Sequence, residues 1–318
     1  MQSVITPPRL AIVVPCYNEE AVLTETNTRL TNLLQELISR SKIKADSFIV
    51  YVNDGSKDQT WQLICQLQQK NTHVRGVKLA HNAGHQNALM AGLESFKDEA
   101  DAMVTIDADL QDDVNAIAAM VDEYLNGSDI IYGVRKERTT DTFFKRTTAL
   151  AFYKLMAIMG TDTVYNHADY RLMSHRAVEA LCQYPERNLF LRGLVPLLGF
   201  ATKNVYYDRA ERFAGESKYP LRKMLAFAID GITSFSIKPI TIIFLTGIGC
   251  FIVGLCLLVW GLYSYLNDMV VPGWTSLLLS LWLIGGVMIT SLGVIGQYVG
   301  KIYIEVKHRP RYHIEEIV

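Results

Sequence analysis

The sequence lacks the features that mark several common classes of protein. Its formal net charge of −1 provides no overall positive field, so nucleic acid is not an expected partner. Neither a G-x-G-x-x-G nor a Walker A loop occurs, which argues against dinucleotide redox chemistry and NTP hydrolysis. The cysteines are odd in number and lack metal spacing, as is ordinary in a reducing compartment. They are Cys16, Cys65, Cys182, Cys250 and Cys256.

Two long stretches lack charged residues altogether. No Asp, Glu, Lys or Arg occurs at 239–267 or at 269–300, and each stretch exceeds the ~20 apolar residues that span a bilayer. We therefore expect two transmembrane helices within residues 239–300. Lys and Arg flank this region on both sides but are missing from the connector at 268–273, so the positive-inside rule predicts that both termini are cytoplasmic. The N-terminus runs directly into a strand pattern, and no signal peptide is expected.

The first 219 residues alternate short apolar runs with segments of helical periodicity. Ser56, with Gln59 three positions later, predicts a capping box that begins a helix ending near Asn71. Strands that alternate with helices imply parallel pairing and right-handed crossovers, so we expect a Rossmann-like, doubly wound α/β domain over residues 1–219. The apolar runs predict strands near residues 10–14, 47–52, 74–79, 102–106 and 129–134.

Polar residues follow these strands. The carboxyl ends of parallel strands meet at one edge of the sheet, where α/β proteins bind ligands. Asp107 and Asp109, with Gln111 close behind, offer the hard oxygen ligands that Mg²⁺ or Mn²⁺ prefers. An acidic pair alone is common in solvated turns, and the motifs around this pair are what favour a metal. His81 and His85 have no third ligand and are expected to be substrate-side polar groups at most. Six side chains should gather at the edge: Asn18, Glu19, Asp54, Asn82, Asp107 and Asp109.

A basic segment follows the fifth predicted strand and leads into an apolar, aromatic run at 150–159. A run of charge is often only a solvated face. A helix that is basic at one end and apolar beyond it is also typical of the membrane interface, and we expect such a helix over about residues 143–160. A second amphipathic helix is expected at 220–238. The cations of the basic segment are Arg135, Lys136, Arg138, Lys145 and Arg146.

Three motifs resemble those of a known enzyme family. They are VVPCYNEE at 13–20, NDGSKD at 53–58 and DADLQD at 107–112. In this order they look like the motifs of family 2 inverting glycosyltransferases with a GT-A fold. With the two apolar stretches, the whole chain is similar to the polyprenyl-phosphate glycosyltransferases, which include dolichyl-phosphate mannose synthase and bactoprenol glucosyltransferase.

The resemblance implies a role for each matching residue. The loop at 212–219 would close over the diphosphate, although a juxtamembrane basic patch is the plainer interpretation. The nucleotide-sugar would contact Pro15, Tyr17, Asn18, Glu19, Asp54, Asn82, Gly84, Asp107, Arg212 and Lys218. The cation, Mg²⁺ or Mn²⁺, would be held by Asp107, Asp109 and Gln111. The acceptor phosphate would be received by Arg135 and by either Arg146 or Lys145.

Asp169 is the carboxylate that the resemblance brings to the acceptor side of the sugar, and with Asp109 it is a candidate catalytic residue. The residues alone leave two other roles open, a structural partner of Arg171 or a cap for a helix beginning near His175. A phosphate monoester has a second pKa of ~6, so the attacking phosphate is already largely ionised near pH 7. We therefore expect Asp169 to orient the sugar or an arginine rather than to remove a proton.

The expected reaction moves one sugar from a nucleotide-sugar to a polyprenyl phosphate with inversion, with UDP-glucose and undecaprenyl phosphate as the first expectation. GDP-mannose remains an alternative donor, because pocket shape decides the sugar. A processive synthase is disfavoured because the Gln-x-x-Arg-Trp motif is missing, and a non-enzymatic membrane adaptor is disfavoured by the intact motifs. The resemblance suggests a homotetramer. Residues 301–318 are expected to form a cytoplasmic tail, with 309–315 a candidate strand for pairing with a neighbouring molecule.

Overall fold

The computed structural model describes residues 6–136, 167–187, 189–208, 238–266 and 273–318. These residues fall into two compact units. One unit comprises the described residues up to 208 together with 309–318, and the other comprises those from 238 to 308. Three predicted segments lie outside the described residues, except for the last residue of the third: the interfacial helix at 143–160, the loop at 212–219 and the amphipathic helix at 220–238.

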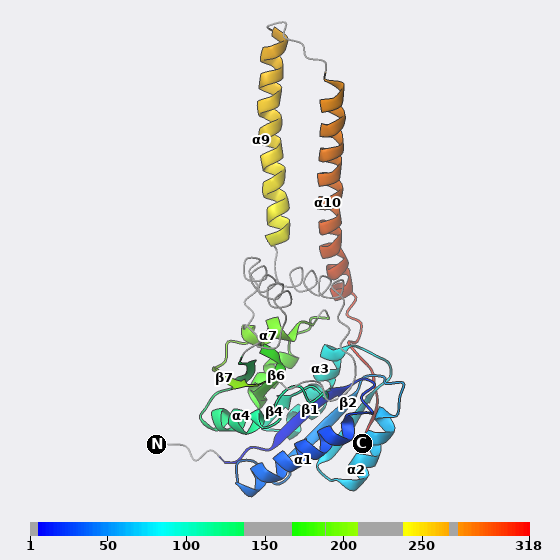
Figure 1. The fold of residues 1–318 in the computed structure, drawn as a ribbon, viewed down its shortest axis with the longest axis vertical. Helices are drawn as coiled ribbons and strands as arrows, with labels where there is room; N and C mark the ends of the chain where they lie inside the picture. The colour runs from blue at the N-terminus through cyan, green and yellow to red at the C-terminus, as the bar shows by residue number, and fades with distance from the viewer. Residues whose placement is uncertain (1–5, 137–166, 188, 209–237, 267–272) are drawn as a thin grey trace. The chain divides into compact units, whose positions relative to one another are not determined.

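A single sheet forms the core of the first unit (Figure 1). In the described part of the chain its strand order is β7-β5-β6-β4-β1-β2-β3-β8. The strands β4, β1, β2 and β3 are neighbours in parallel, which confirms the predicted parallel core. The strands are β1 (Leu10–Cys16), β2 (Phe48–Asn53), β3 (Val74–Leu79), β4 (Ala102–Thr105), β5 (Ile130–Arg135), β6 (His167–Ser174), β7 (Thr202–Tyr207) and β8 (Ile314–Ile317).

The central strands β1 and β2 are buried along their whole length. Parallel strands carry apolar residues continuously because helices cover both faces of the sheet. One of these helices, α3, lies so close to β1 that a Cβ on Gly92 would meet Val13 Cγ1 at 2.4 Å. The helices of this unit are α1 (Leu23–Ser39), α2 (Thr60–Lys70), α3 (His85–Phe96), the short η1 (Lys97–Glu99), α4 (Ala116–Leu125), α6 (His175–Cys182) and α7 (Leu191–Leu197).

The helix after β2 begins later than predicted. Ser56 does not cap it, because its Oγ accepts the backbone N–H of Asn18 at 3.0 Å. The Gln59 N–H donates to Glu20 Oε2 at 2.9 Å, and α2 begins at Thr60. The predicted capping box is therefore wrong. These polar groups join two loops at the sheet edge and do not close one helix end.

The prediction of a wholly parallel, doubly wound sheet is wrong beyond β4. β6 lies between β4 and β5 and runs antiparallel to both, while β7 pairs in parallel with β5. An apolar run indicates a strand but not which strand lies beside it, because pairing depends on contacts far apart in sequence. The inserted strand brings Asp169 beside Thr105, whose Oγ1 donates to the Asp169 carbonyl oxygen at 2.7 Å.

The last strand belongs to the sheet of its own chain. β8 pairs antiparallel with β3 and is the edge strand of the sheet, so the expected pairing of residues 309–315 with a neighbouring molecule stays a prediction. Arg311 holds the segment before β8, with Nη1 3.1 Å from Glu94 Oε1 of α3 and Nε donating to Glu186 O at 3.0 Å. The Tyr312 hydroxyl also donates to Glu94. Residues 309–318 are therefore part of the first unit.

The second unit contains two long helices, α9 (Lys238–Leu266) and α10 (Trp274–Val306). Among the residues searched, which are those that the structure describes, Ile284–Val306 is long and apolar enough to cross a membrane. Lys238–Cys250 forms a shorter apolar segment. One of the two predicted membrane spans is thus supported by length and composition, and the other stays a prediction.

Candidate active site

The loops that follow β1 and β2 are tied together at the carboxyl edge of the sheet. Asn18 has a left-handed backbone with φ of 55°, which a short polar side chain tolerates better than most. Its Oδ1 accepts the Lys57 N–H at 2.8 Å, and the Glu19 N–H donates to the Thr60 hydroxyl at 3.0 Å. Tyr17 in the same loop is 43% exposed. Lys57 of the second motif and Thr60 at the start of α2 therefore hold the loop of the first motif.

Asp54, directly after β2, ties the loop that follows β3 to the same edge. Its carboxylate accepts the backbone N–H groups of Ala83 at 2.6 Å and Gly84 at 3.1 Å. Asn82 Nδ2 donates to the Asp54 carbonyl oxygen at 3.2 Å. Burial raises the pKa of Asp54, and the two backbone hydrogen bonds oppose that shift. Gly84 has φ of 93°, a conformation that favours glycine. The predicted contacts of these residues with a nucleotide stay predictions.

The acidic loop follows β4. Leu110 has a left-handed backbone with φ of 58°, and the Gln111 N–H donates to Asp109 Oδ1 at 3.1 Å. Desolvation raises the pKa of Asp107 to about 6, His85 opposes that shift, and the charges of neighbouring carboxylates add to it. A bound cation would relieve this concentration of negative charge.

The acidic loop does not by itself enclose a metal ion. Within the part of the chain that the structure describes, no group of three or more His, Cys, Asp or Glu side chains is arranged to hold one. Carboxylates and a side-chain amide are nevertheless the hard oxygen donors that Mg²⁺ and Mn²⁺ prefer. The donor set fits a cation that takes its remaining ligands from substrate phosphates and water.

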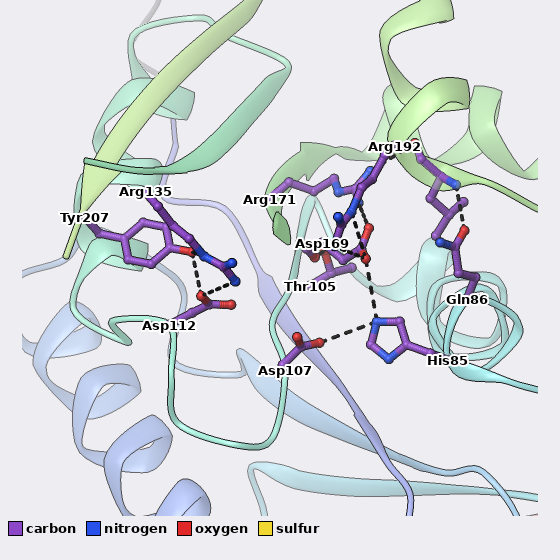
Figure 2. Close-up of polar contacts among 11 residues, drawn as sticks. His85, Gln86, Thr105, Asp107, Asp112, Arg135, Asp169, Arg171, Arg192 and Tyr207 are labelled. Carbon is purple, nitrogen blue, oxygen red and sulfur yellow. Dashed lines mark hydrogen bonds and ion pairs between the residues drawn. The ribbon is translucent and has the colours of Figure 1, made fainter. Parts of the chain in front are cut away.

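Asp169 on β6 is held by two arginines, as Figure 2 shows. Arg171 Nη2 donates to its Oδ1 at 2.6 Å, and Arg192 donates to its Oδ2 from Nη2 at 3.1 Å and from Nε at 3.3 Å. Burial acts to raise the pKa of Asp169, but the charges of Arg192, Arg171 and His85 outweigh it and hold that pKa well below its ordinary value. The carboxylate is therefore ionised at neutral pH.

These contacts decide between the two structural roles that the sequence leaves open for Asp169. The partnership with Arg171 is confirmed, and Arg171 is itself only 1% exposed. The role of helix cap is wrong, because Asp169 lies within β6. Ser174 caps α6, and its side chain accepts the N–H of Ala177.

The first residues of α3 connect the acidic loop to Asp169. His85 Nε2 lies 3.4 Å from Asp107 Oδ1 and 3.9 Å from Asp169 Oδ2, and Figure 2 shows the ring between the two carboxylates. Gln86 Oε1 accepts the N–H of Leu191, the first residue of α7, at 2.7 Å. The start of α3 thus contacts the element that carries Arg192.

A second carboxylate, Asp112, contacts Arg135, which the sequence predicts as a phosphate ligand (Figure 2). Arg135 Nη2 donates to Asp112 Oδ1 at 3.2 Å, and the Tyr207 hydroxyl donates to the same oxygen at 2.6 Å. The Asp112 side chain is 2% exposed and that of Arg135 is 20% exposed. Arg135 is therefore held in place by a buried anion.

Four residues of this site were not predicted from the sequence, and His85 was expected to be only a substrate-side polar group. Two of the four have a signal in the sequence. Asp112 stands within the third motif, and Arg192 is a lone cation in the apolar run FLRGLV at 190–195. Gln86 and Tyr207 carry no comparable signal, because only the packing of α3 against α7 and of β7 beside β5 brings them in.

The remaining predicted residues are not brought together by the described structure. Pro15 lies within β1, opposite Val52 of β2. The other four lie outside the described residues, so their roles stay predictions: Lys145, Arg146, Arg212 and Lys218.

The edge of this sheet therefore brings together an acidic loop, a buried Asp–Arg network and two motif loops, an arrangement that suits an enzyme acting on an anionic, phosphorylated substrate. The chain belongs to glycosyl transferase family 2, whose model matches residues 11–182, and it is a glycosyltransferase. The match includes Asp107 and Asp169 but ends before Arg192 and Tyr207.

Individual relatives extend the similarity along almost the whole chain. The uncharacterized glycosyltransferase YkoT of Bacillus subtilis is 51% identical over 97% of this chain and 91% of its own length. The bactoprenol glucosyl transferase of Shigella phage SfV is 38% identical over 96% of this chain and 98% of its own length. Among solved structures, glucosyl-3-phosphoglycerate synthase from Mycobacterium tuberculosis is 19% identical, with a TM-score of 0.48 over 72% of this chain and 79% of that one.

Proposed function

We propose that this protein transfers a single sugar from a nucleotide-sugar to a polyprenyl phosphate at the cytoplasmic face of a membrane. UDP-glucose and undecaprenyl phosphate are the first substrates to test. The observation that carries the proposal is the 38% identity to a bactoprenol glucosyl transferase over 96% of this chain. The site supports it, because a carboxylate loop and a partly exposed arginine at one sheet edge suit a diphosphate donor and a phosphate acceptor.

The acidic loop provides the donor half of this proposal. Asp107, Asp109 and Gln111 would hold Mg²⁺ or Mn²⁺ together with the diphosphate, and the bound cation would supply positive charge for the departing nucleoside diphosphate. The loops that carry Tyr17 and Asp54 would contact the nucleoside. Their shape is already set by hydrogen bonds between the motifs, which reduces the ordering required when the nucleotide binds.

The second half of the proposal concerns the acceptor. An oxygen of the lipid phosphate forms the new bond to the anomeric carbon while the bond from that carbon to the diphosphate breaks, so the acceptor approaches from the opposite face and the product is inverted. Arg135 receives the lipid phosphate. Asp169, ionised and paired with Arg171 and Arg192, orients Arg192 and the sugar. The lipid phosphate is already ionised and needs no protein base.

Chain connectivity supports the proposed topology. Residues 309–318 return to the sheet of the first unit through β8. The intervening chain must therefore cross the membrane an even number of times, and α9 and α10 offer two crossings. The Lys and Arg that flank this region support a cytoplasmic location of the sheet and both termini in this proposal.

A transfer assay tests the proposal directly. The full-length protein in lipid nanodiscs is given radiolabelled UDP-glucose, undecaprenyl phosphate and Mg²⁺, and the lipid fraction is extracted and counted. We expect label in that fraction only when both substrates are present. Transfer from GDP-mannose and not from UDP-glucose would make GDP-mannose the proposed donor. No lipid-linked sugar from a panel of nucleotide-sugars with undecaprenyl and dolichyl phosphate would overturn the proposal.

A further inference from the structure

Asp112 is a buried carboxylate for which the family motifs imply no role. It lies three residues after Asp109, and its side chain is 2% exposed. A charge is costly to bury unless it is paired. Here the Tyr207 hydroxyl and Arg135 Nη2 both donate to Asp112 Oδ1, at 2.6 Å and 3.2 Å. Arg135 Nε also donates to the Tyr207 hydroxyl oxygen at 3.3 Å. The three side chains form a closed triangle of hydrogen bonds.

The triangle joins the ends of β5 and β7 to the acidic loop. Arg135 and Tyr207 are the last residues of β5 and β7 and lie opposite each other in the sheet. Tyr207 is 2% exposed, and its ring packs edge-on against Tyr170 with centroids 5.3 Å apart. The Tyr170 hydroxyl donates to the Asp113 carbonyl oxygen at 2.9 Å, so the acidic loop is attached at two successive residues.

An anchored arginine is a better phosphate ligand than a free one. A long guanidinium side chain loses rotamer freedom when it binds, and a preformed anchor removes much of that cost beforehand. Nε and Nη2 of Arg135 both take part in the triangle. The Arg135 side chain is 20% exposed, whereas the carboxylate that holds it is buried, so solvent reaches the arginine and not its anchor.

We propose that Asp112 and Tyr207 are positioning residues that hold Arg135 for the acceptor phosphate. Because Asp112 belongs to the acidic loop, the two substrate sites then share one rigid connection between donor and acceptor. This inference rests on the proposed function, in which Arg135 receives the phosphate of the lipid.

Two conservative variants test the inference. Asp112→Asn keeps the shape of the side chain and removes its charge, and Tyr207→Phe removes only the hydroxyl. Each should raise KM for undecaprenyl phosphate about tenfold, the effect of weakening a charge-assisted hydrogen bond. The Kd for UDP by calorimetry should stay within about twofold of the wild-type value, since no nucleotide contact is removed. Tyr207→Phe keeps the test valid if Asp112→Asn does not fold.

Asp113→Asn is the matched control. It makes the same change of charge one residue later, where, among the described residues, the side chain accepts hydrogen bonds only from Asn115 in its own turn. We expect its KM for the lipid to equal that of the wild type. If Asp113→Asn raised KM for the lipid as much as Asp112→Asn, the inference would be overturned, because loop charge in general would then explain both results.

A double-mutant cycle separates positioning from general damage. If Asp112 acts through Arg135, adding Asp112→Asn to Arg135→Ala should leave KM for the lipid unchanged. A further rise in KM in the Arg135→Ala background, or an equal loss of UDP affinity, would overturn the inference while the proposed function stands. A wild-type protein that makes no lipid-linked sugar would remove both.

Discussion

Asp169 shares its carboxylate between Arg171 and Arg192, and this pairing determines when the group changes charge. Its pKa lies below the ordinary value of a carboxyl, since the arginine charges outweigh burial. A depressed pKa contributes stability above the unfolded-state value of ~3.9 and loses it only as the pH falls through the folded value. Asp169 therefore does not titrate between pH 5 and 8.

The pH dependence of transfer should follow the lipid and not Asp169. We expect the acid limb of the pH–rate profile near pH ~6, where a phosphate monoester gains its proton. In Asp169→Asn the limb should persist although kcat drops, because the variant loses orientation and not a base. The measurement is kcat against pH at saturating lipid for both proteins. An acid limb that vanishes in the variant would show that Asp169 removes a proton.

Asp109 is the residue on which the metal proposal can be tested alone. Its Oδ1 accepts the Gln111 N–H, so replacing it by alanine removes one hydrogen bond of a partly buried loop as well as the proposed metal ligand. We expect Asp109→Ala to lose Mn²⁺-dependent UDP binding by calorimetry while its thermal unfolding resembles that of the wild type. EDTA should have the same effect on the wild-type protein, and added Mg²⁺ or Mn²⁺ should reverse it. Undiminished transfer in chelator would remove the metal from the proposal.

At the scale of elements, the existence of strands and helices was easier to predict than their pairing. All five strands expected before residue 135 are present, because buried parallel strands leave a continuous apolar signal. β6 and β7 were not predicted, and β6 separates the consecutive strands β4 and β5. Asp169 and its partner Arg171 both lie on that inserted strand.

A second contact between distant elements holds the C-terminal segment against α3. Arg311, with 8% of its side chain exposed, contacts Glu94 of α3 and the carbonyl oxygens of Glu186 and Tyr184. Arg311→Ala leaves these partly buried acceptors without a charged donor, which should cost about 1–3 kcal/mol. We expect a lower midpoint of thermal unfolding in detergent. Arg309→Ala, at an exposed position, is the control and should leave the midpoint unchanged; equal midpoints for the two variants would contradict the anchoring role.

At the scale of the whole molecule, β8 makes the two ends of the chain parts of one sheet. In the proposed topology, residues on either side of the α9–α10 region therefore lie on the same side of the membrane. This argument does not depend on hydropathy and agrees with the distribution of Lys and Arg.

Cysteine labelling tests this topology. In a background with the five native cysteines replaced by serine, a cysteine at Val271 should react with an impermeant maleimide from outside the cell. A cysteine at Lys307 should react only after the membrane is opened. Reaction of both positions in intact cells would contradict a membrane crossing by α10 and the proposed orientation.

The sequence by itself determined the class of fold, the parallel core and the family, because buried strands and motif loops are local patterns that a single chain displays. It also identified Asp107, Asp109 and Asp169 as the carboxylates of interest. Only the tertiary structure decided what surrounds them. Arg192, Gln86 and Tyr207 join the site through contacts spanning 23, 105 and 95 residues, and no local pattern encodes which distant side chain will neutralise a buried charge.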